Sequence, residues 1–179
     1  SEPATAAADE TTTEEPTTSE PTTAEPTTTP AAENTTNRTT ETMLTVSDES
    51  VSIDENNKQI RLPANTSVET FSAVVTGGQI TVTDDGGAAL SADEVIGTGC
   101  KVLLLDGSGN TVCEYTVYIL MDVDGNGRIT AADARLALRC AAKLEILEGV
   151  HLLAADADVD TYIKPADARL ILRTAAKLD

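Results

Sequence analysis

The sequence predicts an α+β protein in three parts. We expect a disordered linker over residues 1–42, a small β-rich module of Ig-like or α+β type over residues 43–119, and an all-α segment over residues 120–179. Three observations support this order. The composition changes after residue 42, short β-rich runs separated by turn signals fill the middle, and one loop–helix pattern occurs twice after residue 120.

The first part has low sequence complexity. Residues 1–42 contain sixteen Thr and five Pro, and the tetrapeptide EPTT begins at Glu15, Glu20 and Glu25. Such a segment cannot bury enough apolar surface to offset the entropy of ordering the chain. We therefore predict an extended Thr/Pro/Glu tether. The chain begins at Ser1, which we interpret as a processed form or a piece of a longer secreted protein.

The middle part has strand signals. We predict strands near residues 43–47, 50–54, 58–62, 79–84, 101–106 and 111–119. Thr66 and Glu69 form a capping-box pattern before a short helix at about residues 67–75. A hairpin turn near Ser108 places Cys113 opposite about Leu103, so a disulfide between Cys113 and Cys100 is not expected.

Composition excludes several classes of function. The net charge of −18 argues against a nucleic-acid-binding protein, which needs a basic face. No apolar run approaches the roughly 18 residues of a membrane span. Aromatic residues make up 2% of the chain, so carbohydrate binding by stacking on aromatic rings is not expected.

The last part contains a duplicated unit. Residues 129–145 (ITAADARLALRCAAKLE) and residues 163–179 (IKPADARLILRTAAKLD) are identical at 12 of 17 positions. An acidic stretch of twelve residues, 122–133 in one copy and 156–167 in the other, leads into each predicted helix. This self-similarity predicts two half EF-hands, each a loop followed by a helix.

The spacing of the first acidic stretch predicts a calcium loop. Ca²⁺ prefers about six to eight oxygen ligands, which a twelve-residue loop supplies from alternate positions, with Gly at the sharp turn. Gly127 stands at that turn, and Thr130 at the position where a water often binds. The predicted ligands are Asp122, Asp124, Asn126, the carbonyl of Arg128, and Asp133.

The second stretch departs from this pattern at two positions. Its predicted ligands are Asp156, Asp158, Asp160, the carbonyl of Tyr162, and Asp167. Thr161 replaces Gly, which costs on the order of 1 kcal/mol if the backbone there is left-handed. Lys164 stands at the water position and repels a cation. We expect two Ca²⁺ ions, with the first site the more readily formed; acidic turns without metal are the alternative.

These residues resemble a type I dockerin, the duplicated calcium-binding module by which cellulosomal proteins dock onto cohesin modules of a scaffold. The resemblance covers residues 121–179, where MDVDGNGRI stands for the family's GDVNGDGKI-like opening and Met121 replaces the customary Gly. It implies an all-α dockerin with repeats over residues 122–144 and 156–178. Residues 43–119 resemble, less specifically, small β-rich modules that precede dockerins in clostridial and ruminococcal proteins.

The resemblance also implies a partner-binding surface. Dockerins contact their partners through two positions near the loop end and three on the following helix. The matching residues are Ala131, Ala132, Leu138, Arg139 and Lys143 in the first copy, and Pro165, Ala166, Leu172, Arg173 and Lys177 in the second. Ala-Ala and Pro-Ala replace the usual Ser-Thr pair, which predicts an apolar contact flanked by basic groups. Near-identity of the copies suggests that either copy can bind the same cohesin. The alternative interpretation of the Arg and Lys side chains is that they only stabilise the C-terminal half of each helix through its dipole.

Spacing also predicts surfaces on the repeats. Basic residues four positions apart, ending at Lys143 and Lys177, predict a basic stripe along each helix. The predicted helical core consists of Ile129, Leu136, Leu144, Leu152, Ile163, Leu170 and Leu178. A core this small is marginal without a bound metal.

The sequence therefore predicts a secreted, non-enzymatic, calcium-dependent docking segment. We expect its partner to be a cohesin module of a scaffoldin, and its parent protein a plant-polysaccharide-degrading enzyme, such as a glycoside hydrolase, in a cellulosome. The alternative parent is a non-catalytic scaffoldin or a cell-surface adhesin. A free EF-hand calcium sensor is disfavoured, because no incoming helices and no Met-rich groove are indicated.

Overall fold

The computed structural model describes residues 43–178. Every described element belongs to one compact unit. The predicted disordered linker over residues 1–42 lies outside the described residues.

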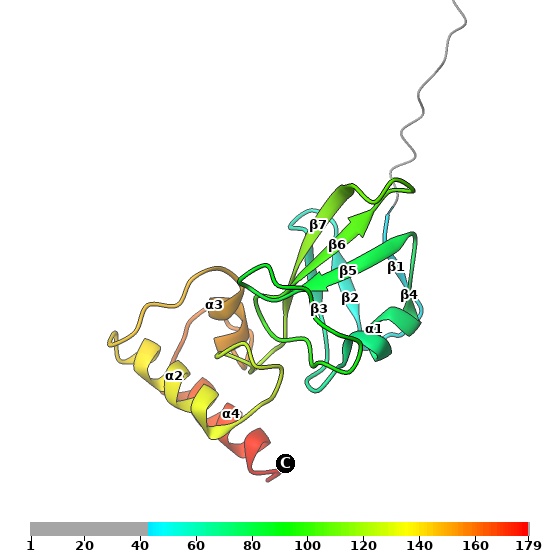
Figure 1. Cartoon of the computed structure of the whole chain (residues 1–179). Helices are drawn as coiled ribbons and strands as arrows, with labels where there is room; N and C mark the ends of the chain where they lie inside the picture. The colour runs from blue at the N-terminus through cyan, green and yellow to red at the C-terminus, as the bar shows by residue number, and fades with distance from the viewer. Residues whose placement is uncertain (1–42, 179) are drawn as a thin grey trace, which may run out of the picture. The chain divides into compact units, whose positions relative to one another are not determined.

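Seven strands and four helices make up the described chain (Figure 1). The strands are β1 (Thr45–Val46), β2 (Ser52–Asp54), β3 (Gln59–Arg61), β4 (Val75–Thr76), β5 (Gln79–Thr83), β6 (Lys101–Leu105) and β7 (Thr111–Tyr118). The helices are α1 (Val68–Val74), α2 (Ala131–Ala141), α3 (Gly149–Ala155) and α4 (Pro165–Ala175). Each of the six predicted strand segments contains a strand, whereas β4 and α3 were not predicted.

The fold class predicted from the sequence is wrong. The prediction separated a β-rich module from an all-α dockerin, whereas the described residues form a mixed α/β structure with two sheets and four helices in one compact unit. The physical reason lies where the helical segment begins. The first acidic loop packs directly on residues 95–98, and its first carboxylate accepts a hydrogen bond from Thr98. The boundary at residues 119/120 stays a prediction.

The larger sheet has the strand order β2-β3-β7-β6-β5. Its strands pair antiparallel except for β3 and β7, which run parallel with Ile60 opposite Val117. The predicted hairpin joins β6 and β7, but Cys113 lies opposite Leu104 rather than Leu103, beside a bulge between Leu104 and Leu105. The smaller sheet contains only β1 and β4.

A hydrophobic core lies between the sheet and α1. Phe71 from α1, Ile60 from β3 and Val117 from β7 are all fully buried in it. Helix α1 begins one residue after the predicted start, because Ser67 rather than Thr66 caps it by accepting the N–H of Thr70.

The three cysteines are free, as expected for Cys100 and Cys113. Cys100 is buried, and its Sγ accepts the N–H of Gly97. Within residues 43–178 no helix has both the length and the hydropathy needed to cross a membrane.

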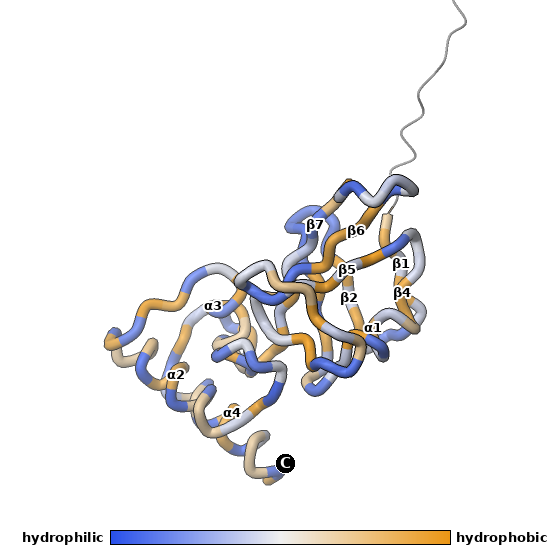
Figure 2. Tube along the Cα trace, viewed as in Figure 1, coloured by the Kyte–Doolittle hydropathy of each residue, from blue (hydrophilic) through white to orange (hydrophobic). Residues whose placement is uncertain are grey.

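The duplicated helices α2 and α4 pack on each other through small side chains. Figure 2 shows hydrophobic and hydrophilic residues alternating along both helices. The buried residues of this second core are Val123, Ala134, Ala137, Ala155, Ala157, Ala168 and Ile171. Ile129, Leu136, Ile163 and Leu170 lie partly buried against it, as predicted.

Three predicted core leucines lie outside this core. Leu144, Leu152 and Leu178 are 69%, 40% and 65% exposed. The helices end before Leu144 and Leu178, and the connector containing Leu152 forms α3, whose buried face is made by Ala154 and Ala155. Periodicity located the apolar residues correctly but not the points at which the helices end.

Both repeat helices end in the same way. Lys143 and Lys177 have φ angles of 60° and 54°, and the N–H of the leucine after each bonds back to Arg139 or Arg173. This Schellman end satisfies the last carbonyls of the helix. It also places Lys143 and Lys177 beyond their helices, so the basic stripes predicted to end at these residues are shorter than expected.

Phe71 allows a test of the sheet core. Phe71→Ala should lower the free energy of unfolding by about 3–5 kcal/mol, because a fully buried aromatic ring is replaced by a cavity. Urea denaturation in excess Ca²⁺ measures this change. Val112→Ala is the control, since Val112 on β7 is 52% exposed and should change stability by about 0.5 kcal/mol at most. Equal losses in both variants would contradict the described packing.

Candidate metal centre

Two groups of aspartates lie in the loops that precede α2 and α4. In each group, one oxygen from every carboxylate lies within 4.8 Å of the others. The first group is Asp122, Asp124 and Asp133, and the second is Asp156, Asp158 and Asp167. Each group could hold a metal ion, and a set of carboxylate ligands is compatible with a hard cation such as Ca²⁺.

Asp122 is the most constrained member of the first group. Its side chain is 0% exposed, and Oδ2 accepts the N–H groups of Thr98 at 2.8 Å and Gly127 at 3.0 Å. Its other oxygen, Oδ1, is buried without a hydrogen-bond partner. A buried acceptor left unpaired is costly, and a cation would satisfy it. Asp122 therefore has one oxygen anchored by the protein and one available as a ligand.

Asp133 joins the loop to the helix. Its Oδ1 accepts the N–H groups of Val123 and Asp124, at 2.8 Å and 2.9 Å. Its Oδ2 accepts both the N–H and the hydroxyl of Thr130. Thr130 in turn accepts the N–H of Ala132, which completes a capping box at the start of α2. The same carboxylate thus orders the loop and caps the helix.

The carboxylates of the first group oppose one another's ionisation. Burial raises the pKa of Asp122, and the charge of Asp133 adds to this effect. Loss of hydration also raises the pKa of Asp124, again with a contribution from Asp133. A divalent cation would remove this repulsion.

The second group is more open. Asp167 is fully buried, Asp156 is half-buried and Asp158 is exposed. Asp156 accepts N–H groups only from its own loop, at Asp160 and Thr161. Asp167 repeats the role of Asp133, accepting the N–H groups of Asp158 and Lys164. Lost hydration and the charges of Asp167 and Asp160 raise the pKa of Asp158.

Asp160, a predicted ligand, lies outside the second group. It forms an ion pair with Lys164, and this hydrogen bond lowers the pKa of Asp160. Lys164 would therefore compete with a bound metal ion for the carboxylate of Asp160. Thr130, at the equivalent position of the first loop, carries no charge.

The remaining predicted ligands form matching turns. Asn126 Oδ1 accepts the N–H of Arg128 at 2.9 Å, and Asp160 Oδ1 accepts the N–H of Tyr162 at 3.0 Å. The two loops therefore share this local conformation, although the carbonyls of Arg128 and Tyr162 remain predictions as ligands.

The turn positions have equal backbone conformations in both loops. Gly127 has φ 76° and Thr161 has φ 73°, so the second loop holds a non-glycine residue in the left-handed region, as the sequence suggested. Two positions earlier, Gly125 has φ 77° and Val159 has φ 58°. The second loop carries two strained residues where the first has glycines.

Nearly all residues of the predicted partner surface are exposed. Leu138 and Leu172 occupy equivalent positions on α2 and α4 and are 48% and 49% exposed. Ala131, Ala132, Arg139, Lys143, Pro165, Arg173 and Lys177 are exposed as well, and Ala166 is half-buried. Arg139 forms an ion pair with Glu145 at 3.1 Å, whereas Arg173 donates to the carbonyl of Leu178.

Several contacts of the first group were not predicted from the sequence. Thr98 lies 24 residues before Asp122, and Asn65 donates its N–H to the carbonyl of Gly127. Residues 97–99 gave no signal of these contacts, because their two glycines belong to a tight turn that the N–H of Cys100 closes by donating to the carbonyl of Gly97. His151, expected as a surface or partly buried connector residue, is partly buried and donates from Nδ1 to the carbonyl of Val123.

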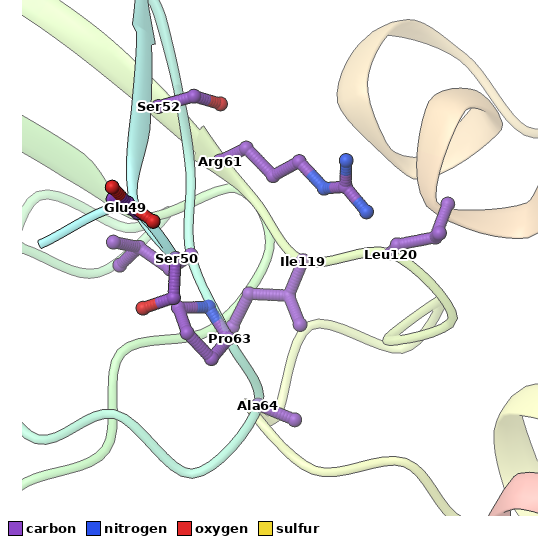
Figure 3. Close-up of a pocket in the computed structure, with 9 residues that line it drawn as sticks. Glu49, Ser50, Ser52, Arg61, Pro63, Ala64, Ile119 and Leu120 are labelled. Carbon is purple, nitrogen blue, oxygen red and sulfur yellow. The ribbon is translucent and has the colours of Figure 1, made fainter.

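A cavity of about 490 Å³ has no aspartate of either group in its lining (Figure 3). Its lining includes Glu49, Ser50, Ser52, Arg61 and Ile119. None of the residues predicted to bind a metal or a partner lines it.

No protein-family model, no curated protein and no solved structure matches this chain.

The left-handed turn of the second loop is open to a direct test. Thr161→Gly should raise the protein's free energy of unfolding by about 0.5–1 kcal/mol, because glycine adopts a positive φ without strain. Thermal or urea unfolding measures the gain. Thr161→Ala keeps the Cβ atom and should bring no such gain. An equal gain from both variants would show that the threonine side chain, not its backbone conformation, is unfavourable.

Proposed function

We propose that the chain is a calcium-dependent docking segment of dockerin type that binds a cohesin module. In this proposal it anchors its parent protein, a secreted enzyme acting on plant polysaccharides, in a cellulosome. The observation that carries the proposal is the duplication itself. Two equivalent carboxylate groups each precede a helix that exposes a Leu–Arg pair, Leu138–Arg139 in one and Leu172–Arg173 in the other.

The residues that would hold the ions follow from the two groups. Asp122, Asp124 and Asp133 would bind the first ion, with Asn126 and the carbonyl of Arg128 as the further predicted ligands. Asp156, Asp158 and Asp167 would bind the second, with Asp160 available only when Lys164 releases it. Each ion supplies positive charge that neutralises clustered carboxylates. The protein's own contribution is to hold those carboxylates at the helix starts through Asp133 and Asp167.

The exposed helix faces support a protein partner. Leu138 and Leu172 present apolar side chains, and Arg139 and Arg173 lie next to them along the chain. Buried apolar contacts with charged groups at their rim are the usual composition of a protein–protein interface. We therefore expect the cohesin to offer an apolar patch for the leucines, with carboxylates around it for the arginines. Such a contact does not need the Ser-Thr pair that the two repeats lack.

Calcium binding is the first test. Titration of Ca²⁺ into the chelator-treated chain should show two binding events accompanied by a gain of helical circular dichroism, since metal binding and loop folding are coupled. Asp122→Asn should remove one event and Asp156→Asn the other. Two events that both survive in each variant would contradict the assignment of the ligands, and the absence of any binding would refute the metal sites.

Cohesin binding is the second test. A panel of cohesin modules is titrated by calorimetry in Ca²⁺ and in chelator, and binding should occur only in Ca²⁺. If either helix can dock, Leu138→Asp or Leu172→Asp alone should weaken binding by about twofold, the loss of one of two equal modes, and the double variant should abolish it. Val112→Asp, at a residue of similar exposure on β7, is the control.

Single variants that each abolish binding would refute the two-mode arrangement but leave docking intact. Binding that survives the double variant would contradict the proposed surface, and binding that persists in chelator would contradict its dependence on Ca²⁺.

A further inference from the structure

The backbone of the first loop lies directly against a segment of the β-rich part. A Cβ atom placed on Gly97 would lie 1.9 Å from the carbonyl oxygen of Gly125. From the other side, a Cβ on Gly127 would lie 2.5 Å from the carbonyl oxygen of Ile96, and one on Gly125 would lie 2.5 Å from that of Thr98. A side chain at any of these three glycines would overlap the backbone of the opposite segment.

Hydrogen bonds from the β-rich part also hold the first loop and the residues just before it. Thr98 donates its N–H to Asp122, and Asn65 donates its N–H to the carbonyl of Gly127 at 2.8 Å. The Thr98 hydroxyl accepts the N–H of Ile119 at 3.0 Å, three residues before the first ligand. The segment is itself fixed to the sheet, because Gly99 donates to Val117 on β7.

Comparison with the second repeat shows whether the turn of the loop or the contact with residues 95–98 requires glycine at position 127. Thr161 adopts the φ angle of Gly127, so the loop conformation alone does not require glycine there. Val159 and Thr161 are exposed, whereas Gly127 is buried beneath Ile96. Gly127 is therefore needed for the approach of residues 95–98 and not only for the turn.

We propose that residues 95–98 are a built-in part of the first metal site, in which Thr98 is a positioning residue. Its N–H holds Asp122 Oδ2 so that Oδ1 faces the cation. The inference rests on the metal sites of the proposed function. The two sites then differ in what holds their ligands. The sheet preorganises the first site, whereas only residues of its own repeat hold the second. By linkage, a cation at the first site stabilises the sheet to the extent that the sheet strengthens the site.

The test uses the full chain, Ca²⁺ as the probe, and a substitution outside the loop. Gly97→Ala places a methyl group where only the Gly125 carbonyl fits, and Gly97 does not have a positive φ, so the change is steric. Gly107→Ala is the matched control, because a Cβ atom at Gly107 has no neighbour within 4 Å. Calorimetry resolves the two events, which Asp122→Asn and Asp156→Asn identify.

Gly97→Ala should weaken Ca²⁺ binding at the first site by about tenfold or more, the loss expected when a charge-assisted hydrogen bond is displaced. The second site should stay within about twofold, and Gly107→Ala should leave both unchanged. Gly127→Thr, which installs the residue of the second loop, should reproduce the loss at the first site. An equal effect on both sites, or no effect in folded variants, would overturn the inference.

A measurement on the unmodified chain covers the case in which these variants fail to fold. Hydrogen exchange should slow in strands β6 and β7 when Ca²⁺ is added, and Asp122→Asn should remove this effect while Asp156→Asn retains it. If both ions bind but the hydrogen-exchange rates in β6 and β7 do not change, the inference is refuted, whereas the proposed function is not. Absence of Ca²⁺ binding would instead refute the proposed function.

Discussion

The link between the sheet and the first repeat depends on one buried carboxylate. Asp122 lies where β7 leads into the first repeat, and it accepts N–H groups from both the sheet side, at Thr98, and its own loop, at Gly127. A buried charge is tolerated only when it is paired or bonded. Two hydrogen bonds satisfy one oxygen, and the other remains unpaired. This imbalance is the strongest physical indication that a cation belongs in the loop.

The two repeats show how one loop sequence adapts to two surroundings. Beside the sheet, the first loop is compact and uses glycines, a neutral Thr130 and a fully buried Asp122. Away from that contact, the second loop tolerates Val159 and Thr161 in the left-handed region and carries Lys164. The duplication preserves the capping carboxylates Asp133 and Asp167, because each both starts a helix and completes a cluster of charges. The two loops share an aspartate at this position because its carboxylate forms equivalent hydrogen bonds in both.

Local signals in the sequence were sufficient for every strand except β4, for the two repeat helices and for the two aspartate groups. These features depend on alternation, spacing and turn residues within about a dozen positions. The fold class failed because it depends on contacts between distant segments, such as Thr98 with Asp122. Leu144 and Leu178 failed for a related reason: apolar spacing continues past Ala142 and Ala176, where the left-handed Lys143 and Lys177 end each helix. Residues 95–99 carry no motif, so nothing in the sequence alone assigned them to the metal loop.

The parallel pairing of β3 and β7 has a mechanical consequence. Tension applied before β3 and after β7 would draw these neighbours in opposite directions along their length. Pairs such as Gln59–Thr116 and Arg61–Tyr118 would then bear the load together in shear, rather than open one after another as in a zipper. If the chain is held by its C-terminal helices and pulled from the N-terminal side, the β3–β7 pair would resist the force as a mechanical clamp, in which all its backbone hydrogen bonds must break together. The contact between residues 95–98 and the first loop extends that clamp to the helices.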